Sequence, residues 1–570
     1  MSAAQYYNGD KQQYQPPPQS YQPINPNQQQ YDMKSSQPYA QGQTYAAPSY
    51  PPPNHQQQQQ IDAEYGGDKN WGDEAPHSQQ TAETGQRFKP KTRLNDPIFL
   101  VLFIANLVGW AVVSAIAIRT FVQYNGLGGG LGNAREGGTG SSVTLNYHTV
   151  YLLLCVCGLA LVVSFVWLMF VRMFTKVIME VTLALTVILN IGICIWYFIN
   201  KYWSGAIIFA VIALISVLSY FFMRKRIPFT KLLVQTTIDV TKHHPSVYVV
   251  VILGLIVEAA LSVWFAFTVI AIYVKWTPNS AACVGDGSCS SAKVTGLIVY
   301  ATFSFFWTSQ VVANIVLCTL AGGVFGGENK HSFGMLTPSG WYYYGPRMND
   351  GTGLPKNASW KALMRACTVS LGSIAFGSLI VTLLELLETF FRMLQSSESS
   401  QGDTVGAILA CCAACCVSCI RGLVAWFNKY AYIEISLYGK AYIPAAKDTW
   451  KLLKDRGIDA LVNDSLVSML IMWGSYINGF LCGLFGYCYL RFTKPSYNAD
   501  GQYTAPVILF SFLIGINLSV TIGRALDAGT STIFVGLGEH PMVLAQRAPV
   551  LFEMIRQKYP RVVQGVPQNY

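Results

Sequence analysis

Ten long apolar stretches constrain the fold of this chain more than any other feature of its sequence. The hydrocarbon core of a bilayer is about 30 Å thick, and an α-helix needs about 20 apolar residues to cross it. The stretches that meet this requirement are 97–119, 148–171, 177–199, 204–223, 247–274, 294–321, 361–391, 405–427, 465–490 and 505–526. The sequence therefore predicts an all-α, polytopic membrane protein with about ten transmembrane helices.

The N-terminal part of the chain has a different composition. Charged residues make up 12% of the whole chain and hydrophobic residues 52%, whereas residues 1–93 consist mainly of Gln, Pro, Tyr and Asn, with runs such as QPPPQ and HQQQQQ. Such a segment has too few apolar residues to form a core, so disorder is expected. We expect a disordered cytosolic tail over 1–93, a ten-span membrane domain over 94–530 and a cytosolic C-terminal segment over 531–570.

The basic residues predict the orientation of the spans. If the N-terminus is cytosolic, the inner segments near the spans carry 26 Lys and Arg and the outer segments carry 8. Because short inner loops are enriched in Lys and Arg, both termini are expected in the cytosol. This scattered charge does not indicate nucleic-acid binding, although the formal net charge is +10. The expected outer loop 275–293 contains Cys283 and Cys289, which we expect to form a disulfide in an oxidising exterior; two free thiols are the alternative.

The sequence holds no motif that would indicate catalysis or ATP use. It lacks GxxxxGK[ST] and HExxH, and no His lies near the middle of a predicted span. The run CCAACCVSC, residues 411–419, has CxxC spacing, but it lies in an apolar span without His or acidic residues nearby. Helix packing is the favoured interpretation, with lipidation as the alternative. We therefore expect no enzyme, no cofactor and no bound metal.

Two acids inside predicted spans are candidates for a functional site. Glu258 lies near the middle of the fifth span and Glu385 in the outer half of the seventh. Charge inside a membrane is costly, so each carboxylate either acts on a substrate or pairs with a base on another helix.

Aromatic and polar residues form a second candidate set. Trp307, Gln310 and Asn314 share one face of the sixth span, and Trp473 and Tyr476 share one face of the ninth. Aromatic faces attract quaternary ammonium groups, but residues at this spacing also serve simply in packing.

The segment AWFNKYAYIEISLYGKAYIPAAKDTW, residues 425–450, is too polar to span a bilayer and unusually rich in tyrosine. Within it, 431–443 is predicted to form a short helix along the inner membrane surface, with Tyr432, Tyr438 and Tyr442 towards lipid, Glu434 facing away and Pro444 ending the helix. These tyrosines form either an inner gate of a transport pathway or a passive interfacial belt.

Several stretches resemble one known family. The segment FNKYAYIEISLYGKAYIPAAKDTW, preceded by SLGSIAFGSLIVTLLELLE, is similar to the choline-transporter-like family, in particular its fungal plasma-membrane branch. Further matching stretches are CTLAGGVFG, WYYYG, LVNDSLV, LRFTKPSYNADGQY and AGTSTIFVGLGEHP, so that the resemblance covers about 93–561. The chain departs from the family pattern at 327–340, where GENKHSFGMLTPSG intervenes.

The resemblance implies ten spans with cytosolic ends, as the charge distribution also predicts. It further implies transport of a small organic cation such as choline across the plasma membrane without ATP hydrolysis, because animal members of the family carry choline and related amines. The partners expected are the lipid bilayer and that cation, and the oligomeric state stays open. The alternative function is a non-transporting membrane organiser that recruits partners through its tail.

Overall fold

The structure is a computed structural model that describes residues 94–125, 147–278, 289–326, 328–330, 336–338, 357–401, 404–495 and 504–539, together with a few isolated positions. The predicted tail over 1–93 and most of the segment after 539 lie outside the described residues. Most of the described residues belong to the helical unit that follows the tail.

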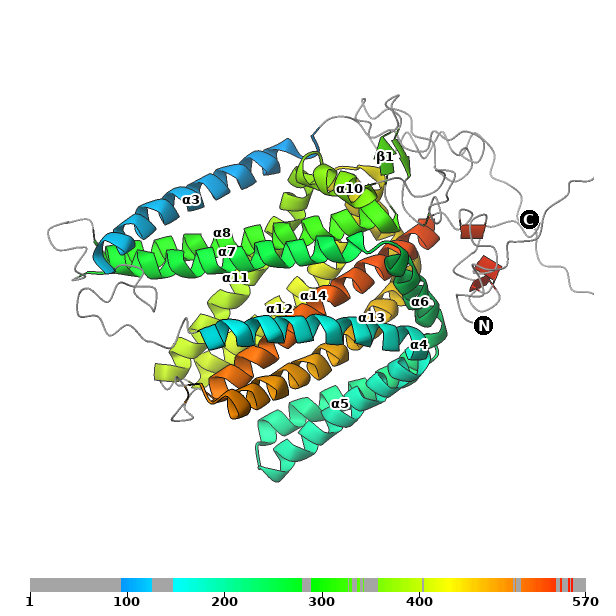
Figure 1. The fold of residues 1–570 in the computed structure, drawn as a ribbon, viewed down its shortest axis with the longest axis horizontal. Coiled ribbons are helices and arrows are strands. Elements are labelled where there is room, and N and C mark those ends of the chain that lie inside the picture. Colours follow the sequence, from blue (N-terminus) through cyan, green and yellow to red (C-terminus); the bar gives the residue numbers. More distant parts are fainter. Residues whose placement is uncertain are drawn as a thin grey trace, which may run out of the picture. The chain divides into compact units, whose positions relative to one another are not determined.

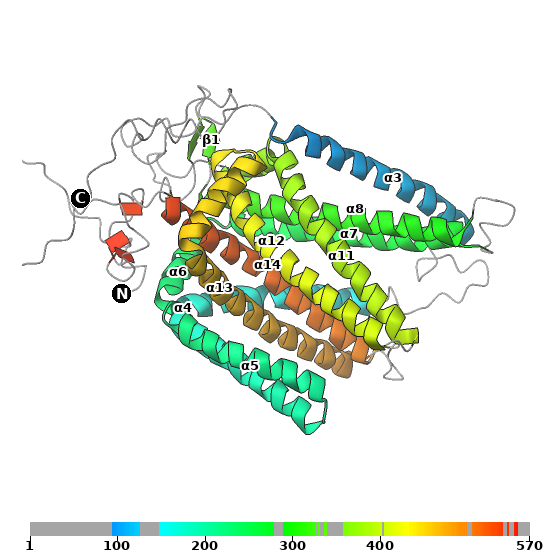
Figure 2. The same cartoon turned by 180° about the vertical axis from the view of Figure 1, so that it is seen from behind.

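Helices make up nearly all of this unit (Figures 1 and 2). Their bounds are α3 Pro97–Asn125, α4 Tyr147–Ile199, α5 Trp203–Arg224, α6 Ile227–His243, α7 Ser246–Trp276, α8 Ser291–Leu320, α10 Ala358–Cys367, α11 Leu371–Gln401, α12 Thr404–Tyr438, α13 Tyr442–Thr493 and α14 Thr504–Glu539. Among the described residues, nine helices are long and apolar enough to cross a membrane. The predicted polytopic helical fold is thus confirmed.

Helix α4 accounts for two of the predicted spans. Its 53 residues are interrupted at Phe174, whose backbone angles (φ −118°, ψ 28°) are not helical. The chain bends there, and the second half of α4 forms a hairpin with α5 (Figure 1). In the described part of the chain, the nine candidate helices, one of them bent in the middle, therefore contain ten segments long enough to cross a membrane.

We call one end of the bundle proximal and the opposite end distal. The proximal end is where α3 and α11 start and where α8, α12 and α14 finish. The short helices α6 and α10 both lie at the proximal end (Figure 1). Helix α6 is held against the bend of α4, because the Arg172 guanidinium donates to the Asp239 carboxylate and Gln235 Nε2 donates to the Arg172 carbonyl at 3.2 Å.

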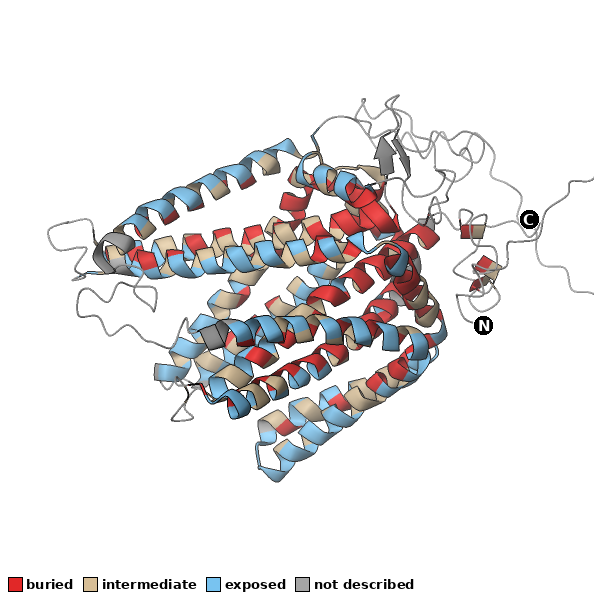
Figure 3. Ribbon diagram, viewed as in Figure 1, coloured by how far each residue is buried: buried red, intermediate tan, exposed pale blue. Residues whose placement is uncertain are grey.

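Buried residues are concentrated at the proximal end, whereas the outward-facing sides of the helices are widely exposed, as expected for surfaces that contact lipid (Figure 3). The motif CTLAGGVFG forms the centre of this packing. Its residues Ala321–Phe325 form a buried π-helical turn, η2. A Cβ on Gly322 would lie 3.0 Å from the Ser436 carbonyl oxygen, so that glycine allows the end of α12 to approach. Arg365 on α10 donates to the Gly322 carbonyl at 2.9 Å.

Two sequence-based boundaries were wrong. The predicted span 361–391 is two helices, because α10 ends at Cys367 and α11 begins at Leu371. The predicted span 405–427 continues as α12 to Tyr438. The segment 327–340 contains a small antiparallel hairpin of β1 Glu328–Lys330 and β2 Leu336–Pro338, which the all-α prediction did not include.

Candidate functional site

The residues predicted on α8 meet helix α11. Gln310 Nε2 donates to Glu385 Oε2 at 3.3 Å, and Asn314 Nδ2 donates to Ser378 Oγ at 3.0 Å. Trp307 Nε1 donates to the Ala375 carbonyl at 3.0 Å. The structure thus brings together four of the predicted residues, which with Ser378 we call the α8–α11 column.

Glu385 has an unusual environment for a carboxylate inside a membrane protein. It lies 14 residues after the start of α11 and 16 before its end, or ~21 Å and ~24 Å along the axis, and so near the middle of this helix. Its side chain is partly exposed, and no basic side chain of the described residues lies within 4.0 Å. Its recorded side-chain partner is the neutral Gln310 amide.

Other deep acids of the described spans are paired with bases. Glu258 Oε1 lies 3.4 Å from Arg524 Nη1 on α14, as the structural alternative predicts. Glu388 is buried and accepts from Arg392 on its own helix at 2.7 Å and from Arg421 on α12 at 2.8 Å. Helical spacing reveals the partner on the same helix but not the one on the neighbouring helix.

Hydrogen-bonded tyrosines close the proximal end of the column. The hydroxyl oxygens of Tyr432 and Ser378 lie 3.3 Å apart. The Tyr442 hydroxyl donates to Asn428 Oδ1 at 2.6 Å, and Asn428 Nδ2 donates to the Gly377 carbonyl at 3.0 Å. Burial raises the pKa of Tyr442 to about 12, so its hydroxyl stays protonated and remains a donor at neutral pH. We call Ser378, Asn428, Tyr432 and Tyr442 the tyrosine network.

The interfacial helix predicted for 431–443 was wrong. Residues up to Tyr438 continue α12, and the chain then turns at Gly439, whose φ is 65° and whose amide donates to the Ile435 carbonyl. Tyr432 is only 1% exposed and packs among protein side chains rather than lipid. Pro444 does not end a helix but stands in the first turn of α13, where a missing amide hydrogen costs little.

Two details of the same prediction also need correction. Glu434 does not face water: it is buried at the end of α12, with Oε2 3.9 Å from Lys440 Nζ. Tyr438 does not share the site of the other two tyrosines, because it is half-buried and its ring lies 4.6 Å from the Lys440 ammonium.

Two residues just before α3, Asn95 and Asp96, hold the α12–α13 turn in place. Asn95 Nδ2 donates to the carbonyls of Gly439 at 2.9 Å and Lys440 at 3.2 Å. Asp96 Oδ2 accepts from the Tyr442 amide at 2.9 Å and from Ser373 Oγ at 2.6 Å. We call this set of contacts the latch, because it ties the start of α3 to α11, α12 and α13 at once.

A buried charge network was missed by the sequence reasoning. Lys429 Nζ on α12 lies 3.0 Å from Asp464 on α13 and 3.1 Å from Asp527 on α14. Asp464 also accepts from the Tyr430 hydroxyl at 3.0 Å and from Trp426 Nε1 at 2.8 Å. Lys429 lies beyond the predicted span 405–427, so the sequence places it outside the membrane. The motif LVNDSLV contained the one available signal, an acid among apolar residues.

The aromatic residues predicted on the ninth span do not join the column. Trp473 Nε1 donates to Thr186 Oγ1 on α4 at 3.1 Å, and Tyr476 is 39% exposed. Their helix turns this face towards α4 rather than α11.

The remaining predictions concern sulfur and metals. Cys289 is disulfide-bonded, and its predicted partner Cys283 lies outside the described residues. Within the described part of the chain, no cluster of three or more His, Cys, Asp and Glu side chains could hold a metal ion.

Comparison with known proteins agrees with this architecture. Residues 207–542 match the family model for plasma-membrane choline transporters. The chain is 62% identical to Protein PNS1 of Cryptococcus neoformans over 565 residues, covering 98% of this chain and 94% of the relative. It is 42% identical to Protein PNS1 of Mycosarcoma maydis, covering 99% of this chain and all of the relative. A multi-pass helical membrane protein with these relatives belongs to the plasma-membrane choline transporter family.

Proposed function

We propose that this protein carries a small organic cation such as choline across the plasma membrane, and that Glu385 attracts the cation. Membership of a transporter family supports membrane transport in general. The observation that carries the specific proposal is the Glu385 carboxylate midway along the candidate spanning helix α11, whose neighbour Gln310 is neutral. A carboxylate at this depth is stable only if a positive charge or a proton compensates it, and a cationic substrate would supply that charge.

The column offers groups for the rest of such a substrate. A quaternary ammonium group has no N–H to donate, so it binds through charge and aromatic faces rather than hydrogen bonds. The hydroxyl and amide groups of Ser378 and Asn314 suit a substrate hydroxyl one to two helical turns away from Glu385. Trp307 has a different role in this proposal: it is 3% exposed and its N–H is occupied, so it positions α11 against α8.

The tyrosine network and the latch act as the inner gate. Proximal ends of the helices are taken as cytosolic, in agreement with the distribution of Lys and Arg. In the structure the network joins α11, α12 and the first turn of α13, which closes the column on that side. Substrate release to the cytosol then requires the α12–α13 turn to separate from α11.

No ATP is needed for accumulation. A potential of 100 mV, negative inside, favours entry of one positive charge by ~2.3 kcal/mol, which corresponds to roughly fiftyfold accumulation.

Uptake of labelled choline by the purified full chain in liposomes tests the proposal. With a potassium-diffusion potential, the wild type is expected to accumulate choline, and accumulation should disappear when the potential is collapsed. Glu385→Gln keeps the shape of the side chain and removes its charge, so KM should rise at least tenfold, or ~1.4 kcal/mol, with unchanged protein abundance.

Glu398→Gln is the matched control, because Glu398 lies on the same helix near its distal end and no base of the described residues pairs with it. Its KM should stay within twofold of the wild type. Equal kinetics of wild type and Glu385→Gln would refute the role of Glu385. Absence of uptake by folded protein for a whole panel of amines would favour the membrane organiser instead.

A further inference from the structure

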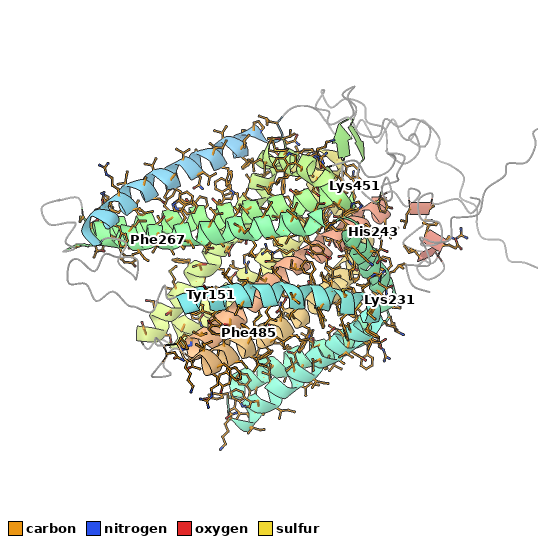
Figure 4. The ribbon with its side chains drawn as sticks, in the orientation of Figure 1. Tyr151, Lys231, His243, Phe267, Lys451 and Phe485 are labelled. Atoms are coloured by element: carbon orange, nitrogen blue, oxygen red, sulfur yellow. The ribbon has the colours of Figure 1, made fainter. Side chains whose placement is uncertain are left out.

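The first part of α13 has two distinct faces. Residues 442–454 precede the apolar span Ala460–Thr493. Lys451 lies at the same end of the bundle as Lys231 and His243, and far from Phe267 (Figure 4). One face of this segment packs on the protein through Ala445, Thr449 and Leu452, which are all buried. These positions are three and four residues apart, as expected for one side of a helix.

The opposite face carries lysines around a tryptophan. Its exposed members are Ile443, Lys447, Trp450, Lys451 and Lys454. Trp450 is 66% exposed and Ile443 54%, so both of these large apolar side chains are free to contact lipid. We call these five residues the lysine–tryptophan face.

This face keeps an excess of positive charge at neutral pH. No acidic side chain of the described residues lies within 4.0 Å of Lys447 or Lys454. Lys451 Nζ lies 3.3 Å from Asp448, but that carboxylate is also bound by Lys440 at 2.7 Å. Burial alone would raise the pKa of Asp448, yet its hydrogen bonds to the two lysines and their charges outweigh burial and lower it. One acid is therefore shared between two bases.

The chemistry of the face fits the surface of a membrane leaflet. Tryptophan prefers the boundary between headgroups and acyl chains, because its ring is apolar and its N–H is polar. Lysines flanking such a ring are attracted to anionic headgroups. The candidate membrane span of the same helix begins at Ala460, so the leaflet is the acidic surface nearest to this face.

We propose that the lysine–tryptophan face binds the headgroups of anionic phospholipids in the leaflet on the proximal side. Trp450 and Ile443 enter the headgroup boundary, and Lys447, Lys451 and Lys454 contact the phosphate and carboxylate oxygens above it. Interfacial helices with lysines beside an exposed apolar stripe bind in this way. Under this proposal the interfacial helix begins at Tyr442 and not at residue 431.

Quenching of Trp450 fluorescence tests the proposal on the full chain. The protein is placed in nanodiscs of phosphatidylcholine with 20% phosphatidylserine, in which either the serine lipid or an equal amount of the choline lipid carries bromine near the headgroup end of its chains. The contribution of Trp450 is the difference between the wild type and Trp450→Phe. We expect brominated phosphatidylserine to quench this contribution severalfold more than brominated phosphatidylcholine does.

Charge variants then assign the effect to the lysines. Lys447→Gln, Lys451→Gln and Lys454→Gln together should bring the two quenching values to equality, since each lysine contributes about fivefold in local lipid preference. The three Lys→Arg changes should retain the preference and show that the face still folds. Lys201→Gln, at the exposed turn of the distal α4–α5 hairpin, is the control and should leave the preference unchanged.

Three results would overturn the proposal. Equal quenching by both lipids in the wild type would show that the face has no preference for anionic headgroups. A preference that survives the triple Lys→Gln variant would show that these lysines do not create it. Absence of quenching by either lipid would place Trp450 outside the leaflet and favour an acidic protein segment as its partner.

Discussion

Replacing Asp96 by Asn weakens the latch without straining the backbone. Asp96 has a φ of 49°, in the left-handed region that Asn tolerates as well as Asp does. The substitution keeps the size of the side chain and one acceptor oxygen, but it removes the negative charge that accepts from the Tyr442 amide and from Ser373. Any effect therefore comes from the two hydrogen bonds.

The magnitude follows from those two bonds. Hydrogen bonds to a charged group contribute about 1.5–3 kcal/mol and those between neutral groups about 0.5–1.5 kcal/mol, so loss of the charge costs about 1 kcal/mol per bond. Two bonds give ~2 kcal/mol, or roughly a thirtyfold increase in the population with the latch open. Asp96 is half-buried, so this value is an upper estimate.

Hydrogen–deuterium exchange of the amides in 439–446 measures this opening directly, because the Tyr442 amide is itself a donor to Asp96. Exchange in that peptide should accelerate ~10- to 30-fold in Asp96→Asn. Ser290→Ala, which removes the N-cap bond to Lys293 at the distal start of α8, should leave it unchanged. Wild-type exchange in Asp96→Asn would refute the assignment of the latch.

Three further predictions follow from the charged groups. Lys429→Met leaves two carboxylates in the bundle without their base, so the free energy of unfolding, measured by thermal unfolding in detergent, should fall by about 3 kcal/mol. Adding Asp464→Asn should recover part of this loss. An unchanged melting temperature in Lys429→Met would contradict the network. Asp448→Asn should destabilise the α12–α13 turn by up to about 1 kcal/mol at pH 7. The pKa of Asp448 is lowered on folding, so its carboxylate stabilises the folded state above that pKa. The difference in stability between wild type and variant should therefore persist between pH 6 and 8 and vanish as the pH falls through that pKa. Impermeant maleimide added to intact cells that lack other accessible thiols should label Glu398→Cys and not Lys440→Cys; external labelling of the latter would reverse the orientation.

The number and approximate position of the spans could be predicted from the sequence. A membrane core has a fixed thickness, and every backbone group inside it must be hydrogen-bonded within a helix, so length and apolarity alone identify the crossings. Helical spacing also placed Trp307, Gln310 and Asn314 on one face correctly, because that geometry is local to a single helix. The family was recognisable from the same sequence for a different reason: its motifs are uninterrupted runs of residues, which can be read without knowing how the helices pack.

Only the tertiary structure decided whether a given face of a helix contacts lipid or another helix. Lipid chains and protein interiors are both apolar, so the pattern that placed Tyr432 on one stripe of a helix could not tell whether α11 or lipid lay against it. The pairing of Lys429 with Asp464 joins residues 35 positions apart on different helices. The latch likewise joins Asp96 to Tyr442 across 346 positions. Such contacts depend on how the helices pack, and no periodicity within one helix contains that information.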